Sequence, residues 1–399
     1  MKINRIIYKE LANEISKPFI SILIGPRQVG KTFLMRQLEE ECRQSGLKTQ
    51  FHNLEDPDDL RFFSGDEDQL IRQLKNTDAD VLFLDEFHYL KNATRIFKVL
   101  YDSGMKVKIF ASGSSSMEIH KHLKESLAGR FRLSLVHLLF GNELRQLADY
   151  SFAEFMRFGG LPGLMHEPGA ADKMALLKNV LQTYLLKDIK ALIKEENLRA
   201  FNSLLYGLAQ NQGQVVAIAA LARDVGLSEP AIKHHLDLMA QTYVCFPIDS
   251  YSRNLANELK KVKKYYLYDT GIRNCILNDY SPLDDRPDKG AIIESFVALA
   301  VIKQLKVNME VKFWRTRQGD EVDFILLKNR IPVPVEVKYR LPAPVVPDGM
   351  RKFLQKYPDA PLALVFSKDN LGEVECCGRP VRFLEWQEAE EIEYLRKVE

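Results

Sequence analysis

The sequence predicts an α/β protein whose first part is a parallel sheet covered by helices on both faces. Strand-length apolar segments alternate with amphipathic helical stretches from about residue 18 to residue 140. These segments are almost continuously apolar, as expected of strands that are buried on both faces. The chain has 399 residues, of which 46% are hydrophobic and 28% charged, and this length is sufficient for two or three folded domains.

Four strands are expected in the first part, which we place at residues 1–145. The segments are FISILIG, TQFHNLE, DVLFLDE and VKIFASG, and helical stretches such as KTFLMRQLEEECRQSG lie between them. A helix between successive strands is the usual connection when the strands run parallel. The sequence therefore predicts a sheet whose strand carboxyl ends meet at one edge.

The overall charge and the cysteine content limit the classes of function. The net charge is +2, so any contact with nucleic acid has to come from local basic patches. The five cysteines show no metal-ligand spacing, which favours reduced thiols. No signal-peptide core stands at the N-terminus, and no stretch reaches the roughly 18 apolar residues of a membrane span. We expect a cytoplasmic protein that does not enter the membrane.

The loop after the first strand fits the pattern G-x-x-x-x-G-K-[ST] without a mismatch. A strand precedes it and a helix follows, which is the context that this pattern requires. Glycines let the backbone N–H groups point at phosphate oxygens, and the helix N-terminus adds partial positive charge. Lys31 can reach the β- and γ-phosphates, and the Thr32 hydroxyl can ligate Mg²⁺. The expected ATP-binding residues are Gly25, Pro26, Arg27, Gln28, Val29, Gly30, Lys31, Thr32 and Phe33.

A second motif, VLFLDE, completes the predicted nucleotide site. Four apolar residues lead to Asp85 and Glu86 at the end of a buried strand. We expect Asp85 to hold Mg²⁺ and Glu86 to orient or deprotonate the attacking water. Glu86 and Lys31 are the two residues of this motif pair that we assign to catalysis. A GTPase is disfavoured because no N-K-x-D motif follows at the proper place.

Two further segments are weaker candidates for this site. The strand KIFASG leads into Ser112 and Ser114, and Ser114 could sense the γ-phosphate, although an ordinary strand-to-helix turn explains the segment equally well. The segment LAGRFRLS carries Arg130 and Arg132. Arg130 could act in trans on a neighbour's nucleotide, which would require a homo-oligomer. The alternative is a solvated or salt-bridged arginine.

Residues 146–280 are expected to be helical and to contain a helix-turn-helix in IAALARDVGLSEPAIKHHLDLM. Gly226 allows the turn, and Ser228 is placed to cap the second helix. Lys233, His234 and His235 are expected to lie partly outward, where a recognition helix meets DNA. TYVCFPIDSY could form the wing of a winged helix. Such units also serve as protein-packing modules, and both interpretations stay open.

Residues 281–399 carry an arrangement of acids typical of nucleases. Asp323 lies on a predicted strand, and Glu336 and Lys338 alternate on one face of the next. A turn at 328–330 would bring Asp323 near Glu336, and Glu294 on the preceding helix would point to the same cluster. Three carboxylates and a lysine suit Mg²⁺-dependent phosphodiester cleavage.

The expected order of elements in this last part is α-β-β-β-α-β. This order supports the nuclease-like interpretation over a surface hairpin with alternating charges. A nuclease-like fold does not by itself ensure cleavage. Pro332 and Pro334 remove ladder donors, so this half of the strand is expected at a sheet edge.

Several motifs together resemble a known group of proteins. They are GPRQVGKT, LFLDE, ASGSSS, LAGR, GGLP, YLLKDI, YLYDTGI and RTRQGDEVDFIL…PVEVKYR. The chain resembles the bacterial and archaeal family of predicted AAA-superfamily ATPases with a C-terminal domain of unknown function. The resemblance implies an ATPase domain, a winged-helix-like middle and a PD-(D/E)xK-like C-terminal unit. It supports Lys31, Thr32, Asp85, Glu86 and Arg130 at the nucleotide, and Glu294, Asp323, Glu336 and Lys338 in the second pocket. The sequence departs from the PD pattern because Val322 precedes Asp323.

Three functions follow as hypotheses. The first is an ATP-hydrolysing switch or motor that acts on nucleic acid, with DNA favoured, through its C-terminal part. The second is a nuclease in which ATP gates cutting at the carboxylate and lysine cluster. The third is an ATP-regulated module that holds a protein partner. No motif in the sequence identifies a protein partner.

Overall fold

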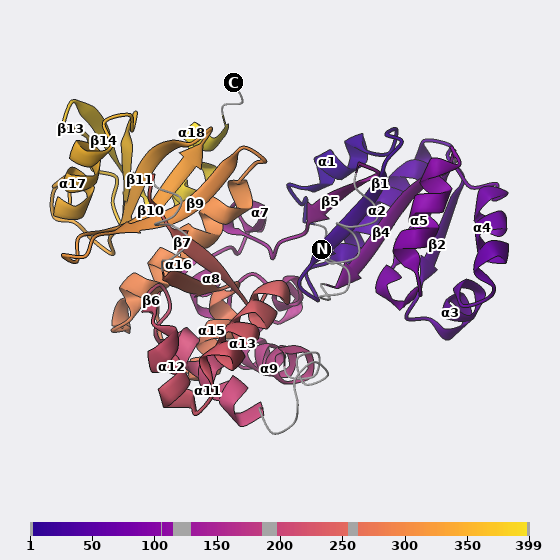
Figure 1. Cartoon of the computed structure of the whole chain (residues 1–399), viewed down its shortest axis with the longest axis horizontal. Coiled ribbons are helices and arrows are strands. Elements are labelled where there is room, and N and C mark those ends of the chain that lie inside the picture. Colours follow the sequence, from indigo (N-terminus) through magenta and orange to yellow (C-terminus); the bar gives the residue numbers. More distant parts are fainter. Residues whose placement is uncertain (1–2, 105, 115–128, 186–197, 254–261, 397–399) are drawn as a thin grey trace. The chain divides into compact units, whose positions relative to one another are not determined.

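The computed structural model describes residues 3–104, 106–114, 129–185, 198–253 and 262–396. These residues form two compact units (Figure 1). The first unit comprises residues 1–139 with the short segments 161–166 and 241–243, and the second comprises 140–160, 167–240 and 244–399. Each unit has its own sheet.

The first unit is built on a five-stranded sheet in the order β2-β3-β4-β1-β5. Every pairing in this sheet is parallel. The four strands predicted from the sequence are confirmed, and β5 was not predicted. The strands are β1 (Ile20–Gly25), β2 (Thr49–Asn53), β3 (Val81–Asp85), β4 (Lys108–Ser114) and β5 (Phe131–Leu135).

Helices cover both faces of this sheet. Alternate residues of β1, including Ile22 and Ile24, pack with residues of α4 and α5 in one apolar core. On the opposite side, Phe83 and Phe110 stack with ring centroids 5.4 Å apart. The helices are α1 (Tyr8–Asn13), α2 (Lys31–Gln44), α3 (Pro57–Phe63), α4 (Glu67–Lys75) and α5 (Ala93–Asp102).

The second unit contains a mixed nine-stranded sheet in the order β13-β14-β12-β11-β10-β9-β7-β8-β6. Strands from both sides of the boundary expected at residue 280 therefore join one sheet. They are β6 (Val215–Val216), β7 (Cys245–Ser250), β8 (Lys263–Leu267), β9 (Met309–Arg315), β10 (Glu321–Lys328), β11 (Ile331–Val337), β12 (Ala363–Ser367), β13 (Gly372–Cys376) and β14 (Arg379–Glu385).

Two helices cover opposite faces of the C-terminal strands. The helix α17 (Asp348–Lys356) packs Met350 and Phe353 onto β10 and its neighbours. The helix α16 (Lys289–Gln304) is apolar over most of its surface, with Phe296 fully buried, as expected for a helix inside a domain. The order α16-β9-β10-β11-α17-β12 confirms the expected α-β-β-β-α-β sequence of elements.

The proline-containing half of β11 has a neighbour on one side only. Residues 331–335 pair with β10, whereas β12 pairs with β11 only from Val335 to Val337. The expectation that Pro332 and Pro334 lie at a sheet edge is therefore confirmed for this half of the strand. Proline is tolerated there because no ladder partner requires the missing N–H.

The remaining helices of the second unit lie mostly before β9. Two of them, α12 and α13, are joined at Gly226, whose φ of 74° is left-handed, and the Ser228 hydroxyl accepts from the Ala231 N–H at 3.4 Å. The predicted helix pair is thus confirmed. The helices are α7 (Gly141–Leu144), α8 (Phe152–Phe158), α9 (Ala170–Val180), α11 (Leu198–Gln210), α12 (Ile218–Val225), α13 (Glu229–Gln241), α15 (Thr270–Leu277) and α18 (Glu393–Arg396).

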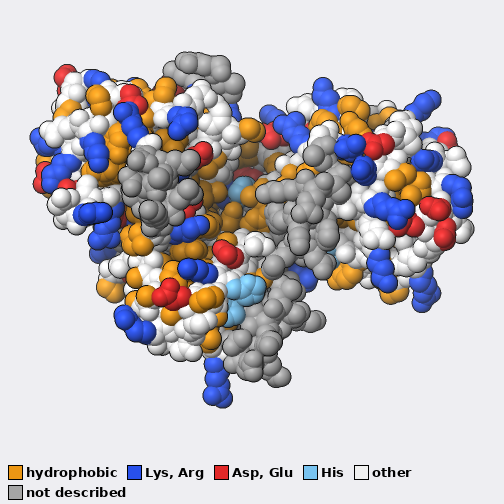
Figure 2. Space-filling view, in the orientation of Figure 1, with side chains coloured by type: hydrophobic (Ala, Val, Ile, Leu, Met, Phe, Trp, Pro, Cys, Tyr) orange, Lys and Arg blue, Asp and Glu red, His pale blue; other side chains and the backbone are white. Residues whose placement is uncertain are grey.

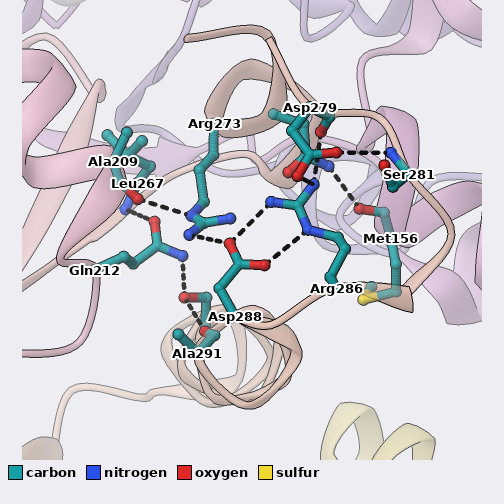
Figure 3. Close-up of polar contacts among 12 residues, drawn as sticks. Met156, Ala209, Gln212, Leu267, Arg273, Asp279, Ser281, Arg286, Asp288 and Ala291 are labelled. Atoms are coloured by element: carbon teal, nitrogen blue, oxygen red, sulfur yellow. Dashed lines mark hydrogen bonds and ion pairs between the residues drawn. The ribbon is translucent and has the colours of Figure 1, made fainter. Parts of the chain in front are cut away.

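The polar segment NDYSPLDDRPDKG, residues 278–290, is fixed by a buried network (Figure 3). Arg286, 3% exposed, donates from Nε and Nη2 to the two Asp288 oxygens, both at 2.8 Å. Arg273, fully buried on α15, donates to Asp288 Oδ2 at 2.7 Å and to the Ala209 carbonyl at 3.0 Å. Charge-assisted bonds of this kind are strong in a buried setting. The segment is therefore part of the second unit's core.

Charged residues of both signs are interspersed on the visible face of each unit (Figure 2). This distribution matches the small net charge of +2. Among the described residues, no helix is both long and apolar enough to cross a membrane.

Candidate functional sites

The loop between β1 and α2 depends on two glycines. Gly25 has a φ of +148°, and a Cβ there would lie 2.2 Å from the Val136 carbonyl oxygen. Gly30 has a φ of 88° and directly precedes the first residue of α2. Both positions are strained for any residue with a side chain. The sequence thus forms a tight turn that directs the N-terminus of α2 toward the carboxyl edge of the sheet.

Lys31 lies inside this loop and is 5% exposed. Its Nζ donates to the carbonyls of Gly25 at 3.1 Å and of Pro26 at 2.8 Å. Burial lowers the pKa of Lys31 to about 8, and the nearby charges of Glu86 and Asp85 partly offset that effect. The ammonium group is therefore held next to the two acids by the loop's own carbonyls.

Asp85 connects β3 to β4 and to the first turn of α2. It is 1% exposed at the end of β3. The Thr32 hydroxyl donates to Asp85 Oδ2 at 2.6 Å, and the Ser112 hydroxyl of β4 donates to Oδ1. In the strand order β3-β4-β1 the three strands are neighbours and end at the same edge of the sheet. The end of β3, the end of β4 and the loop that follows β1 therefore lie side by side, which brings the three side chains together. A hydroxyl and a carboxylate at this distance are oxygen ligands that could hold Mg²⁺.

Glu86 follows β3 in an uncommon backbone conformation. Its φ of 53° and ψ of 46° are left-handed, which is strained for a glutamate. Its Oε2 lies 3.1 Å from Nδ1 of His88. Non-glycine residues held in this region concentrate at functional sites. The conformation places the carboxylate near Lys31, whose pKa it raises.

The other predicted loop residues differ in exposure. Val29 is fully buried, and Phe33 on the first turn of α2 is 50% exposed. Gln28 has a left-handed φ of 58°. The backbone of Ser114 pairs with Gly25 across β4 and β1, whereas its side chain lies outside the described residues.

Arg130 and Arg132 lie at the opposite edge of the sheet. Arg130 immediately precedes β5, which runs parallel to β1, so it lies near the start of β1 and not near the loop at its end. It makes a two-point contact with Asp102, Nε to Oδ1 at 2.6 Å and Nη2 to Oδ2 at 3.2 Å. Arg132 lies 3.2 Å from the buried carboxylate of Glu14. Any role of Arg130 at a nucleotide is therefore restricted to a neighbouring copy.

Arg5 supports the loop and was missed in the sequence. It is 7% exposed, and its guanidinium donates to the Val29 carbonyl at 2.7 Å and to the His137 carbonyl at 2.5 Å. The N-terminal segment thereby joins the glycine loop to the segment that follows β5. No local pattern predicts this role, because Arg5 stands alone in an amphipathic N-terminal stretch.

The second predicted site is assembled in the C-terminal unit. The turn at Asn329 and Arg330 pairs β10 with β11, and Asp323 Oδ2 accepts from the Val337 N–H at 2.8 Å. Lys338 Nζ lies 2.6 Å from Glu336 Oε1. The pairing of β10 with β9 is irregular between residues 322 and 325. At this irregularity two residues of β10, one of which is Asp323, lie between successive paired positions.

Burial disfavours the charged forms of the carboxyl groups in this cluster. Burial, together with the charge of Asp323, raises the pKa of Glu294 to about 7 and of Glu336 to about 8. The pKa of Asp323 is also raised by burial, against the attraction of Lys264 and Lys338. Glu294, Asp323 and Glu336 therefore share one electrostatic environment, as the sequence predicted.

Three residues of this cluster were not predicted. Lys264 on β8 is 2% exposed, and its Nζ lies 2.6 Å from Glu321 Oε1 and 3.3 Å from Glu294 Oε1. The Tyr266 hydroxyl donates to the same Glu294 oxygen at 2.6 Å. The signal was the alternation of Lys264 and Tyr266 within the strand KKYYL, which directs both side chains to one face.

The contacts of these acids bear on the metal site expected from the sequence. Within the part of the chain that the structure describes, no group of three or more His, Cys, Asp and Glu side chains that could hold a metal ion is found. The Lys264 ammonium contacts both Glu294 and Glu321. The expectation that these acids bind Mg²⁺ stays a prediction.

The second helix of the helix pair carries a mixed surface. Lys233 and His234 are exposed as predicted. The prediction for His235 is wrong, because it is 3% exposed and its ring packs edge-on against Phe201 at 5.8 Å. Burial lowers its pKa, so the neutral form is favoured. Acidic Glu229 and Asp237 are exposed on the same helix, which leaves its outer surface without an excess of positive charge.

Comparison with protein families finds a match for each part of the chain. Residues 17–155 match the model of an AAA domain. Residues 149–282 and 289–377 match two domains of unknown function (DUF8612 and DUF4143). The first part of the chain is thus similar to AAA domains, and the later parts are similar to domains whose function is not assigned.

The relatives found by sequence are uncharacterized proteins. One from Mycobacterium tuberculosis is 26% identical over 350 residues, covering 87% of this chain and 76% of the relative. One from Methanocaldococcus jannaschii is 24% identical, covering 81% and 75%. One from Haemophilus influenzae is 23% identical, covering 81% and 83%.

Solved structures show only weak similarity. AMPPCP-bound DnaA from Aquifex aeolicus is 14% identical with a TM-score of 0.29, covering 59% of this chain and 86% of that one. The Pif1 helicase from Candida albicans is 12% identical with a TM-score of 0.27, covering 45% and 48%. Scores this low do not establish a shared fold, so the fold rests on the strand order of this chain.

Proposed function

We propose that the first unit binds and hydrolyses Mg²⁺-ATP. The observation that carries this proposal is the meeting of Thr32 and Ser112 on the Asp85 carboxylate, directly beside a complete glycine loop with Lys31. A structural turn needs none of these side chains, whereas a P-loop nucleotide site uses a lysine, a hydroxyl and an acid in the places of Lys31, Thr32 and Asp85.

Each residue has a distinct role in the proposed reaction. The backbone N–H groups of residues 25–32 cradle the phosphates, and Lys31 exchanges its loop carbonyls for phosphate oxygens. Thr32 and Asp85 would hold Mg²⁺, which when bound neutralises charge on the β- and γ-phosphates. Glu86 orients the attacking water and accepts its proton. His88, 3.1 Å away, holds the Glu86 carboxylate.

Hydrolysis in the first unit would drive a change in the C-terminal unit, as in a switch or motor. Nucleic acid is the partner that we test first. The order of α11, β6, α12, α13, β7 and β8, with β8 between β6 and β7, supports the winged-helix interpretation of this segment. The mixed charge of α13 does not favour strong phosphate binding. A protein partner is therefore the alternative outcome.

The experiment measures ATP hydrolysis with Mg²⁺, with and without added DNA or RNA, and analyses the same nucleic acid on a gel. The proposal predicts hydrolysis that Lys31→Ala abolishes. Stimulation by intact nucleic acid supports a nucleic-acid switch. Hydrolysis without stimulation, and without binding at low salt, supports a protein partner. Absence of both ATP binding and hydrolysis contradicts the proposal.

A further inference from the structure

The carboxylates of the C-terminal unit already have cationic partners. Glu294, Glu321, Asp323 and Glu336 are the acids of the cluster. Lys264 contacts Glu294 and Glu321, and Lys338 contacts Glu336 at 2.6 Å. Arg315 Nη1 lies 3.6 Å from the second oxygen of Glu321. Four acids thus face three permanently or readily charged bases, so little negative charge remains for a metal ion to neutralise.

The position of Lys264 also disfavours a metal ion at Glu294. A divalent cation needs several oxygen ligands at about 2.0–2.6 Å with lone pairs directed at it. Glu294 Oε1 already accepts from Tyr266 at 2.6 Å and lies 3.3 Å from Lys264 Nζ. Because Lys264 is 2% exposed and fixed on β8, its ammonium cannot turn away into solvent without breaking these contacts. A cation bound to Glu294 would stand next to this buried positive charge.

We propose that Lys264 is the fixed counter-ion of this cluster and takes the place that a divalent cation has in a metal-dependent nuclease. The pocket then keeps the order of elements and the acids of a nuclease-like unit, but it does not bind the metal that activates water for phosphodiester cleavage. This inference concerns the second unit alone and is independent of ATP hydrolysis in the first.

The test measures binding of Mn²⁺, without nucleotide, to the full chain. Asp85→Asn serves as the parent so that the P-loop does not contribute. Adding Asp323→Asn to the parent should therefore not reduce its Mn²⁺ binding. Lys264→Met should gain one Mn²⁺ site, and Asp323→Asn in that background should remove it. Lys264→Arg, which keeps the charge, is the matched control and should gain none.

Two results overturn the proposal. The first is Mn²⁺ binding by the parent that Asp323→Asn abolishes, because Lys264 would then coexist with the metal. The second is a folded Lys264→Met protein that gains no Mn²⁺. If Lys264→Met does not fold, the proposal is still tested by Mn²⁺ binding to the parent, to its Asp323→Asn variant and to Lys264→Arg.

Discussion

The Thr32 hydroxyl donates a 2.6 Å hydrogen bond to Asp85, although the two residues are 53 positions apart in the sequence. The bond joins the first turn of α2 to the end of β3. It fixes the two oxygen groups that we propose as the Mg²⁺ site before any nucleotide arrives. Preformed geometry of this kind lowers the reorganisation needed on binding.

Replacing Thr32 tests this relationship. Thr32→Ala removes the hydroxyl and should reduce Mg²⁺-dependent ATP hydrolysis at least tenfold, about 1.4 kcal/mol in transition-state stabilisation. Thr32→Ser keeps the hydroxyl and should retain most activity. The measurement is the hydrolysis rate against Mg²⁺ concentration. Equal rates for Thr32→Ala and wild type would remove Thr32 from the metal site.

The pKa of Lys31 predicts a pH dependence of nucleotide binding. Burial lowers this pKa to about 8 in the free protein, whereas phosphate contact favours the charged form. Below pH 8 the ammonium is present, so ATP affinity should be constant. Above pH 8 a proton must be taken up on binding, and affinity should fall by up to about tenfold per pH unit.

The measurement for Lys31 is ATP affinity from pH 7 to pH 9.5, with proton uptake recorded in buffers of different ionisation enthalpy. Lys31→Arg is the control, since its guanidinium stays charged over this range. A flat wild-type affinity across pH 8, without proton uptake, would show that Lys31 does not contact the phosphates.

Arg5 is predicted to position the glycine loop. Arg5→Ala leaves the carbonyls of Val29 and His137 without their donor and should lower the free energy of unfolding by roughly 1–3 kcal/mol. It should also weaken ATP binding, because Val29 is part of the loop. Denaturant unfolding and ATP titration measure the two effects. Arg61→Ala, at an exposed arginine 80% accessible, is the control and should change stability by less than about 0.5 kcal/mol.

The raised pKa of Glu336 predicts how stability changes with pH. The folded protein holds the Glu336 proton up to about pH 8, whereas the unfolded chain releases it near 4.5. The folded state therefore binds more protons between these values, and this stabilising contribution is lost as pH rises through about 8. Glu336→Gln should make the free energy of unfolding less dependent on pH. The difference in this free energy between pH 4.5 and 9 should shrink by on the order of 1–3 kcal/mol.

Denaturant unfolding at several pH values checks the Glu336 prediction. The matched control is Glu373→Gln, an exposed acid in an ion pair with Arg382 on the surface, and it should leave the pH profile unchanged. If Glu336→Gln shows the wild-type profile, the carboxyl is not held protonated by the fold.

The nucleotide site could be predicted from local patterns. The loop from Gly25 to Thr32 is contiguous, and Asp85 ends a nearly uninterrupted apolar strand, so both positions follow from strand and helix signals. The strand β5 could not be predicted in this way. It is an edge strand with partly exposed Phe131 and Arg132, and its pattern lacks the apolar continuity of its neighbours.

The C-terminal cluster was predicted in part. Period-two alternation placed Glu336 and Lys338 on one face, and the turn at residues 328–330 brought Asp323 to them. Lys264 could not be placed in the cluster, because β7 and β8 join the C-terminal strands only through the pairing of β7 with β9, between segments about 60 residues apart. The alternation within β8 indicates which side chains share a face, but the local sequence does not show which strands lie beside them. His235 was misplaced because helical spacing does not fix the width of a buried face.

The most direct test of the central claim compares ATP hydrolysis and ATP retention in wild type and Glu86→Gln. The strained backbone of Glu86 and its position next to Lys31 predict that the amide variant binds Mg²⁺-ATP with near wild-type affinity. It should hydrolyse ATP about 10²–10⁴-fold more slowly, as expected for loss of a general base. Glu55→Gln, at an exposed acid, is the control. Unchanged hydrolysis by Glu86→Gln would contradict the proposed role of this site.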